Sequence, residues 1–400
     1  MALLPVADAL ARILDGVKPL APETVALDRA AGRVLAHPVI ARRDQPPFPA
    51  SAMDGYAVRH ADVQQVPARL RITGISAAGR AYRKGLKPGD AIRILTGAPV
   101  PSGADTVVIQ ENTSREGDWL TVFHAPPQGK NIRRAALDFA RGDTVLDTGE
   151  RLRPRDLGLA AAANAAAVKV RRRPHVILFA TGDELVLPGQ RARPDQIYSS
   201  NSHALAAMAE SLGARVSNLG IVPDTLAATK AAVRRAMAGD ILLTTGGASV
   251  GDHDYVQEAF KACGIRIGFW KIAMRPGKPF MYGRKGKLHV MGLPGNPVSA
   301  LVTARLFLKP LIDALQGLPP QGEPPLAELE VAMPGNDERQ DYVRAIMTVA
   351  RDGRLRVKPF EVQDSSMQRT LQLANCLIIR TPGAPVAPVG TPVPVLMLDF

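Results

Sequence analysis

Three short segments rich in glycine and carboxylates contain the residues of this sequence best suited to chemistry. They are Thr181-Gly182-Asp183-Glu184-Leu185, the run from Gly246 to Tyr255, and Leu293-Pro294-Gly295-Asn296-Pro297. Glycine lets the backbone approach a ligand closely, and free amides at the start of a helix attract phosphate. The carboxylates between the glycines would repel phosphate unless a divalent cation lay between them. These segments therefore predict a site that holds phosphate through Mg²⁺.

Each acidic residue in these segments also has a simpler explanation. Asp183 or Asp252 could cap a helix, because a side-chain oxygen in front of a helix satisfies one of its free amides. All three segments, however, follow predicted strands of one sheet, and ligands of open parallel sheets bind beyond the carboxyl ends of the strands. Convergence of three such loops favours a binding site over isolated caps.

A basic segment follows the second loop. It carries Lys271, Arg275 and Lys278, with proline and glycine between them fixing the backbone. Three cations so close together suit a small oxyanion, and solvated surface charge is the alternative. The seven histidines form no motif with a serine or a cysteine. We therefore expect charge neutralisation, rather than a covalent nucleophile, to carry the chemistry.

Strands and helices alternate from His175 onward. Short apolar runs are separated by longer helical patterns, which predicts a parallel sheet covered on both faces. The expected strands are 176–180, 214–222, 240–245 and 287–292, and the expected helices are 201–212, 224–238, 252–263 and 297–315. Asn296 stands where it would cap the last helix, with Pro297 in the first turn.

The first 174 residues have a different pattern. Helices are expected over 6–17 and 152–168, on either side of short β-type runs such as 91–95, 106–110 and 119–123. Glycine and proline separate these runs, as is typical of a compact, mostly β domain. We therefore expect a mostly β domain inserted into a helical one.

The chain is too long for one ordinary core, so several domains are expected. The predicted divisions are a helical domain made of 1–45 and 146–174, an inserted mostly β domain at 46–145, an α/β domain at 175–318, and, after a proline-rich linker, a C-terminal β domain at 326–400. The fold class is thus multidomain α/β plus β.

The composition of the chain limits the classes of ligand and partner that it is expected to bind. The net charge of +13 favours anionic ligands without naming one. The densest cationic run, Arg171-Arg172-Arg173, lacks the interleaved aromatic residues of a single-strand binding platform, so we interpret it as a solvated connection and predict no nucleic-acid partner. Two cysteines without metal-ligand spacing suit a reducing compartment, and no apolar stretch approaches the roughly 20 residues that span a bilayer. A cytoplasmic protein without a membrane partner is expected.

Several motifs resemble the signatures of the MoeA family, which includes the E domain of gephyrin. They are Ser51-Ala52-Met53-Asp54-Gly55-Tyr56-Ala57-Val58 after Pro46-Pro47-Phe48, then Ile94 to Pro101, Thr181 to Leu185, Thr245 to Tyr255, Arg275 to Pro279 and Gly292 to Ser299. One such motif alone is weakly specific. The set occurs in the family's order, however, and is very specific, while the C-terminal segment fits the family pattern more weakly.

The resemblance implies a molybdopterin molybdenumtransferase. Its substrates would be adenylylated molybdopterin and molybdate, its products molybdenum cofactor and AMP, and its metal Mg²⁺. The α/β domain would be MogA-like. The resemblance also implies a homodimer whose cleft lies between the β domain of one subunit and the α/β domain of the other, with the molybdopterin adenylyltransferase as a further partner.

Carried over motif by motif, the resemblance and the three loops give an expected set of site residues. The expected catalytic positions are Asp54, Thr96, Asp138, Glu184, Asp224 and Asp254, and the expected metal ligands are Asp54, Glu184, Asp252 and Asp254. The expected substrate-binding positions are Gly182, Asp183, Gly246, Gly247, Ser249, Lys271, Arg275, Lys278, Pro294, Pro297, Arg344, Ser365 and Ser366.

The chain departs from the family pattern at three places. Pro49-Ala50 stand where the family usually has polar, often acidic, residues. Around Asp138 the family reads Gly-Glu-Asp, whereas this chain has Ala136-Leu137-Asp138. The loss of the glycine and the glutamate bears on the conformation of that loop. Gln368 and Arg369 also differ from the usual C-terminal pattern.

Two rival functions belong to different classes. A molybdopterin adenylyltransferase also uses a MogA-like domain, but the additional segments 1–174 and 318–400 favour molybdenum insertion. A non-enzymatic scaffold of the gephyrin kind would not require acids and glycines at three strand ends. In the favoured mechanism, carboxylates hold Mg²⁺ against the pyrophosphate and the basic segment holds molybdate beside the dithiolate.

Overall fold

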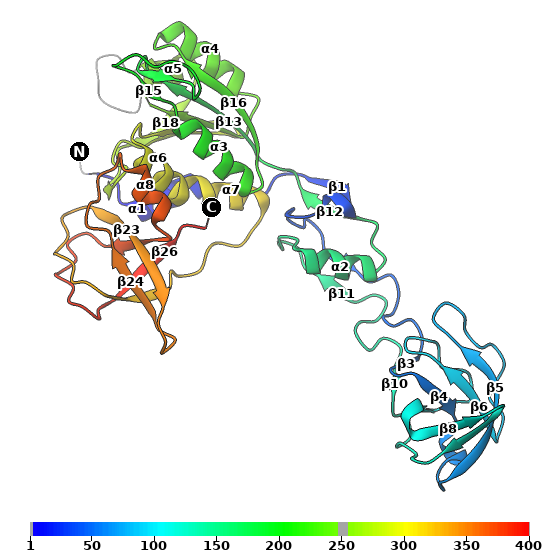
Figure 1. Cartoon of the computed structure of the whole chain (residues 1–400). Helices are drawn as coiled ribbons and strands as arrows, with labels where there is room; N and C mark the ends of the chain where they lie inside the picture. The colour runs from blue at the N-terminus through cyan, green and yellow to red at the C-terminus, as the bar shows by residue number, and fades with distance from the viewer. Residues whose placement is uncertain (1–2, 247–254, 400) are drawn as a thin grey trace. The chain divides into compact units, whose positions relative to one another are not determined.

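A computed structural model describes residues 3–246 and 255–399 of the chain (Figure 1). The chain divides into two compact units. Unit 1 comprises Met1–Glu23, Gly32–Val34 and Arg171–Phe400, and unit 2 comprises Thr24–Ala31 and Leu35–Val170. Within the described ranges, no helix is long and apolar enough to cross a membrane.

Unit 2 is built around a six-stranded sheet in the order β7-β4-β6-β5-β9-β8. The strands are β4 (Gly55–Val58), β5 (Ala68–Ser76), β6 (Asp90–Ile94), β7 (Thr106–Ile109), β8 (Thr113–Glu116) and β9 (Trp119–Val122). The β-type runs predicted at 91–95, 106–110 and 119–123 are confirmed as β6, β7 and β9. Strand β4 pairs antiparallel with β6, Gly55 opposite Ile94. The residue before β4 therefore lies beside the loop that follows β6.

The rest of unit 2 includes small two-stranded ladders and one α-helix. The ladders pair β1 (Pro22–Ala26) with β12 (Ala167–Arg171), β2 (Val39–Ile40) with β11 (Thr144–Leu146), and β3 (Ala50–Ser51) with β10 (Ile132–Arg133). The helix expected over 152–168 is shorter, because α2 spans only Pro154–Ala162. Asn164 adopts a left-handed φ of 64°, which ends the helix before the chain enters β12.

The α/β part of unit 1 contains a second six-stranded sheet, in the order β16-β13-β17-β21-β20-β18. Its strands are β13 (His175–Thr181), β16 (Arg215–Val222), β17 (Ile241–Thr245), β18 (Arg266–Trp270), β20 (Met281–Lys285) and β21 (Leu288–Leu293). The first four in the order are parallel, as predicted. Strands β20 and β18 extend the sheet antiparallel to their neighbours, so the complete sheet is mixed.

Helices cover both faces of this sheet (Figure 1). They are α1 (Val6–Leu14), α3 (Asn201–Ser211), α4 (Leu226–Ala236), α5 (Tyr255–Ala262), α6 (Pro297–Thr303) and α7 (Lys309–Gln316). Val176 and Leu178 of β13 pack in the core with α1, α3, α6 and α7, whereas Ile177 and Phe179 pack with α4 and α5. Burial on both faces explains why these strands are continuous apolar runs.

The long helix predicted over 297–315 is interrupted. A π-helical segment, η4 (Ala304–Leu308), separates α6 from α7. Pro310 follows it in the first turn of α7 and has no amide N–H to donate to Leu306. The wider turn accommodates that missing donor, since π segments are where an α-helix absorbs such an irregularity.

The C-terminal part of unit 1 is a small closed barrel. Its strands are β22 (Leu326–Leu329), β23 (Gln340–Val349), β24 (Leu355–Pro359), β25 (Cys376–Arg380) and β26 (Pro392–Met397), and α8 (Gln368–Leu373) lies between β24 and β25. The sheet closes because β23 pairs with both β24 and β25. Strand β19 (Met274–Arg275), from the basic segment, adds to β23. The multidomain α/β plus β class is thus confirmed.

The run Arg171 to Arg173 is not the solvated connection that we predicted. Arg172 donates to both carboxylate oxygens of Asp240 at 2.8 and 2.9 Å, and Arg171 donates to the carbonyl oxygen of Leu20 at 3.2 Å. The Asp240 carboxylate also accepts the backbone amide of His175 at 2.8 Å. The charge of Arg172 is therefore used to fix the start of the parallel sheet.

Candidate functional site

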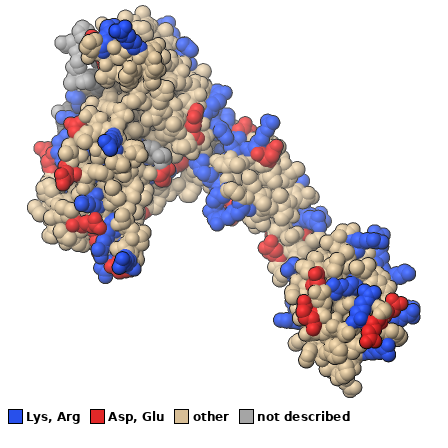
Figure 2. Space-filling view, viewed as in Figure 1, with Lys and Arg blue, Asp and Glu red and all other residues tan. Residues whose placement is uncertain are grey.

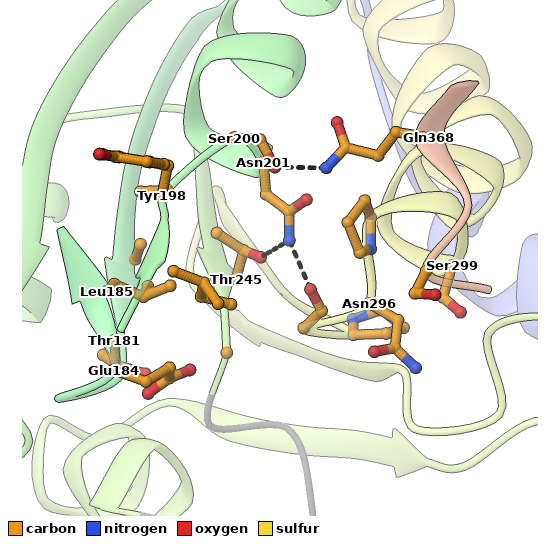
Figure 3. A pocket seen from close by; sticks show the side chains of 18 of the residues that line it. Thr181, Glu184, Leu185, Tyr198, Ser200, Asn201, Thr245, Asn296, Ser299 and Gln368 are labelled. Atoms are coloured by element: carbon orange, nitrogen blue, oxygen red, sulfur yellow. Dashed lines mark hydrogen bonds between the residues drawn. The ribbon is translucent and has the colours of Figure 1, made fainter. Parts of the chain in front are cut away.

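A pocket of about 850 Å³ lies at the carboxyl ends of β13, β17 and β21 (Figure 3). The ends of these neighbouring strands bring together Thr181, Glu184, Thr245, Gly246 and the loop 294–297. The remaining lining residues are Ala180, Leu185, Gln196, Ile197, Tyr198, Ser199, Ser200, Asn201, Pro279, Ser299, Ser366 and Gln368. The convergence of the three loops, as far as the structure describes them, therefore follows the prediction from strand order.

Two glycines are required by the geometry of the pocket floor. Gly246 has a φ of 85°, and a β-carbon on it would lie closer than 3.0 Å to the carbonyl oxygen of Thr181. Gly182 has a φ of 142°, a backbone conformation that residues with a side chain rarely adopt. Glycine alone fits such positions without strain. The loops after β13 and β17 can therefore pack against each other and carry Glu184 at the rim.

Asn201, the first residue of α3, links the end of β17 to the loop after β21. Its Nδ2 donates to Thr245 Oγ1 at 2.9 Å and to the carbonyl oxygen of Gly295 at 2.7 Å (Figure 3). A carbonyl can only accept, so the amide orientation is fixed. This residue was missed by the sequence analysis, although its position at the start of the predicted helix 201–212 was visible.

The C-terminal barrel supplies one wall of the pocket. Gln368 Nε2 donates to Ser200 Oγ at 2.9 Å, and Asn296 Nδ2 donates to Ser365 Oγ at 2.9 Å. Asn296 occupies the N-cap position of α6, but its side chain accepts no hydrogen bond from the helix. The predicted side-chain cap is therefore wrong, because the Asn296 side chain instead forms a hydrogen bond with Ser365 of the C-terminal barrel domain.

Arg344 stands behind this wall. It is 1% exposed, and its guanidinium donates to Gln363 Oε1 and to the carbonyl oxygens of Asp364 and Met367. Burial lowers the pKa of Arg344. Arg344 thus holds in place the loop that carries Ser365 and Ser366, and only Ser366 of these three lines the pocket.

The charged lining of the pocket is acidic rather than basic. Among the described lining residues, Glu184 is the one charged side chain, and no lysine or arginine is present. On the face drawn in Figure 2, cationic side chains are interspersed with acidic ones over both units. The positive net charge of the chain is therefore not concentrated in this pocket, and an anionic ligand there needs a cation from elsewhere.

The basic segment contributes only Pro279 to the pocket lining and differs from the expected free cluster. Arg275 pairs with Asp341 and, at 3.2 Å, with Asp337; the hydrogen bond to Asp341 and the charges of both aspartates raise the pKa of Arg275. Lys271 lies over the ring of Trp270, 4.4 Å from its centroid. The exposed Lys278 is directly followed by Pro279, which lines the pocket. Of the three cations, Lys278 is the one whose position suits a ligand.

A second constellation lies in unit 2. Asp54 Oδ1 accepts the backbone amide of Thr96 at 2.6 Å and its hydroxyl at 2.9 Å. These two hydrogen bonds lower the pKa of Asp54, and the nearby charge of Arg93 adds to the effect. Asp138 is exposed in the same unit, where its amide donates to the carbonyl oxygen of Gln45 at 2.9 Å.

Several expected site residues are not gathered by the structure. Gly247, Ser249, Asp252 and Asp254 lie outside the described residues. Asp183 is exposed next to Glu184 but does not line the pocket, and Asp224 follows β16 without lining it. Among the described residues, no group of three histidine, cysteine or acidic side chains could hold a metal ion.

A mixed α/β domain with a pocket at its strand ends, joined to β-rich domains, defines a multidomain α/β plus β protein with a candidate ligand-binding site. The chain matches the MoeA N-terminal region (domains I and II) over residues 4–164. It matches a probable molybdopterin binding domain over 177–314, and the MoeA C-terminal region (domain IV) over 327–398.

Similar proteins agree with these matches. The molybdopterin molybdenumtransferase of Haemophilus influenzae is 37% identical over 365 residues, 90% of each chain. That of Bacillus subtilis is 33% identical over 405 residues, 99% of this chain and 94% of that one. The crystal structure of a molybdopterin biosynthesis MoeA protein from Pyrococcus horikoshii aligns with a TM-score of 0.83 at 28% identity, covering 99% of this chain and 100% of that chain. The chain belongs to the MoeA family of molybdopterin molybdenumtransferases, which act in molybdenum cofactor biosynthesis.

Proposed function

We propose that this enzyme inserts molybdenum from molybdate into adenylylated molybdopterin, releasing AMP and forming molybdenum cofactor. The observation that carries the proposal is the pocket at the ends of β13, β17 and β21. Its volume of about 850 Å³ suits a ligand larger than a single nucleotide base, and the polar side chains of Glu184, Thr245 and Asn296 line it at the three strand ends. The binding of an adenylylated pterin at this place agrees with the preference of α/β sheets for ligands at such ends.

Mg²⁺ is the metal that we propose for this pocket. A pyrophosphate beside Glu184 would meet a like charge, since the described lining contains no cation to offset it. Mg²⁺ commonly binds through one or two carboxylates together with substrate phosphates, so a single described carboxylate is a sufficient protein ligand. Glu184 would hold the ion, with Asp54, Asp252 and Asp254 as the other proposed ligands. Bound Mg²⁺ would neutralise the charge that develops as the phosphoanhydride breaks.

The chain's own residues position the substrates. Gly182 and Gly246 leave room for the backbone to approach the phosphates, and Pro294 and Pro297 shape the opposite loop. Lys278, next to the lining residue Pro279, and Ser366 on the barrel wall would bind molybdate. Lys271, Arg275 and Ser365 are the other proposed molybdate residues, and Arg344 would contribute by holding the loop that carries Ser365 and Ser366. Arg275 would have to exchange a carboxylate partner for the oxyanion, because Asp341 and Asp337 hold it now.

The proposed catalytic residues lie on two units of the chain. Asp54, Thr96 and Asp138 belong to unit 2, whereas Glu184 and Asp224 belong to unit 1. We propose that the enzyme is a homodimer in which each cleft takes Asp54 from one chain and Glu184 from the other, and that the molybdopterin adenylyltransferase delivers its product to it. The two buried cysteines are free thiols, which suits a cytoplasmic enzyme.

Turnover by the purified full chain tests the proposal. Adenylylated molybdopterin, molybdate and Mg²⁺ are supplied, and AMP release and formation of molybdenum cofactor are measured together. Wild-type enzyme should yield both products, and Glu184→Ala should yield neither at a comparable rate. Glu210→Ala is the matched control, because Glu210 is an exposed glutamate of α3 outside the pocket lining. Absence of AMP release by wild type, or full activity of Glu184→Ala, would refute the proposal.

A further inference from the structure

Arg93 of β6 lies beside the Asp54 constellation. It pairs across the sheet with Tyr56 of β4, and its guanidinium carbon lies over the Tyr56 ring, 5.1 Å from the ring centroid. Stacking on an aromatic ring fixes the plane of a guanidinium and leaves its N–H groups at the edge available. The side chain is therefore ordered before any ligand arrives.

The hydrogen bonds of Arg93 go to uncharged acceptors. Its Nη1 donates to the carbonyl oxygen of Gly55 at 3.2 Å, and its Nη2 donates to Gln110 Oε1 at 2.8 Å. The orientation of the Gln110 amide is consistent, since its Nε2 faces Glu111 Oε1 at 3.4 Å. Two of the five guanidinium N–H groups are thus used, and no described carboxylate forms an ion pair with Arg93.

This arrangement differs from that of two other arginines, Arg275 of the basic segment and Arg172 at the start of the parallel sheet. Arg275 is neutralised by two aspartates, and Arg172 is neutralised by Asp240. Arg93 instead keeps an unpaired positive charge next to a carboxylate that is itself held by Thr96 rather than by a cation. A fixed guanidinium with free N–H groups is a good binding group for a tetrahedral oxyanion.

We propose that Arg93 is a further substrate-binding residue, which donates to a tetrahedral oxyanion held beside Asp54. This oxyanion is either the phosphate of the nucleotide part or molybdate. The inference rests on the proposed function only for the identity of these two anions. Sequence motifs did not reveal it, because the signal is a cross-strand contact between β4 and β6.

Binding measurements on the full chain test this inference without requiring turnover. AMP and molybdate are titrated separately by calorimetry in the presence of Mg²⁺. Arg93→Gln, which removes the charge, should weaken the binding of one of the two anions about tenfold or more, as expected for loss of a charge-assisted hydrogen bond. Arg93→Lys should retain part of the affinity, because it keeps the charge but not the paired N–H geometry.

Arg69 supplies a matched control in the same sheet. Its guanidinium lies over the Trp119 ring at 4.6 Å, on strands β5 and β9. Arg69→Gln should leave both affinities unchanged. A loss confined to AMP would identify the phosphate, and a loss confined to molybdate would identify the metal oxyanion. Unchanged affinity for both anions in Arg93→Gln, or an equal loss in Arg69→Gln, would overturn the inference. Failure of the enzyme to form molybdenum cofactor would refute the proposed function but leave this result standing.

Discussion

Replacement of Gly246 by alanine should open the pocket floor and destabilise unit 1. Gly246 has a φ of 85°, and a left-handed conformation costs an alanine about 1–2 kcal/mol. The added methyl group would also lie too close to the carbonyl oxygen of Thr181, and within 3.3 Å of its carbonyl carbon and hydroxyl. Thr181 is backbone-paired in β13 and cannot turn aside as a flexible side chain would, so the overpacking adds about 1–3 kcal/mol.

The expected total is roughly 2–5 kcal/mol, a large share of the 5–15 kcal/mol that stabilises typical domains. Gly189→Ala separates the two contributions. Gly189 has a φ of 87°, but nothing lies within 4 Å of the added carbon. It should therefore show only the backbone cost, and the difference between the two variants should be the overpacking of about 1–3 kcal/mol.

Urea unfolding followed by fluorescence provides the measurement. The chain has two tryptophans, and a Trp119→Phe background leaves Trp270 of β18 to report on unit 1 alone. AMP release is measured on the same proteins and should fall strongly only in Gly246→Ala. Equal stabilities of Gly246→Ala and Gly189→Ala would refute the reasoning, because the contact with Thr181 would then carry no penalty.

Three further predictions concern other parts of the chain. A mixture of inactive Asp54→Ala and Glu184→Ala proteins, allowed to exchange subunits, should recover about a quarter of wild-type turnover, by analogy with catalytic groups acting in trans. No recovery, with exchange confirmed by mass, would contradict the shared cleft. Ala136→Gly should stabilise the protein by about 1 kcal/mol in unfolding experiments, since Ala136 has a φ of 56°; an unchanged or lower stability would contradict this. Burial lowers the pKa of His289 to about 4, below its ordinary value of 6.5. Unit 1 should therefore keep the stabilisation from neutral His289 above about pH 6.5 and lose it as the pH falls to about 4. His289→Gln should flatten this part of the pH–stability profile, and an identical slope would contradict the assignment.

Ala136 adopts a left-handed backbone conformation although it is not a glycine. Where the MoeA motif has glycine, this chain combines a glycine-like φ with an alanine. Leu137, at the glutamate position of that motif, is 62% exposed. The departure therefore changes the side chains presented beside Asp138, where the local turn is left-handed.

Most elements of the α/β domain could be predicted from the sequence. The local spacing of apolar residues indicates whether an element is buried on one or both faces. The predicted bounds of β13, β17, β21, α3 and α4 are therefore close to the observed ones. The meeting of three loops followed as well, because neighbouring parallel strands end at the same edge of a sheet.

Interruptions of regular elements were not predicted. Alanine-rich sequence favours helix through residue 168, yet Asn164 takes a left-handed φ and β12 pairs with β1. Similarly, η4 occurs in a segment whose apolar pattern is typical of one continuous helix. Pairing with a distant strand, or a proline that removes one donor, outweighs local propensity in these places.

The sequence by itself determined which chemical groups this protein possesses and at which ends of which strands they stand. Only the tertiary structure decided how each charge is used. Arg275 is paired with Asp341 through the register of β19 and β23, whereas Arg93 meets the ring of Tyr56 through the register of β4 and β6. Such pairings join residues far apart in the chain, and their energies depend on distances that no local pattern encodes.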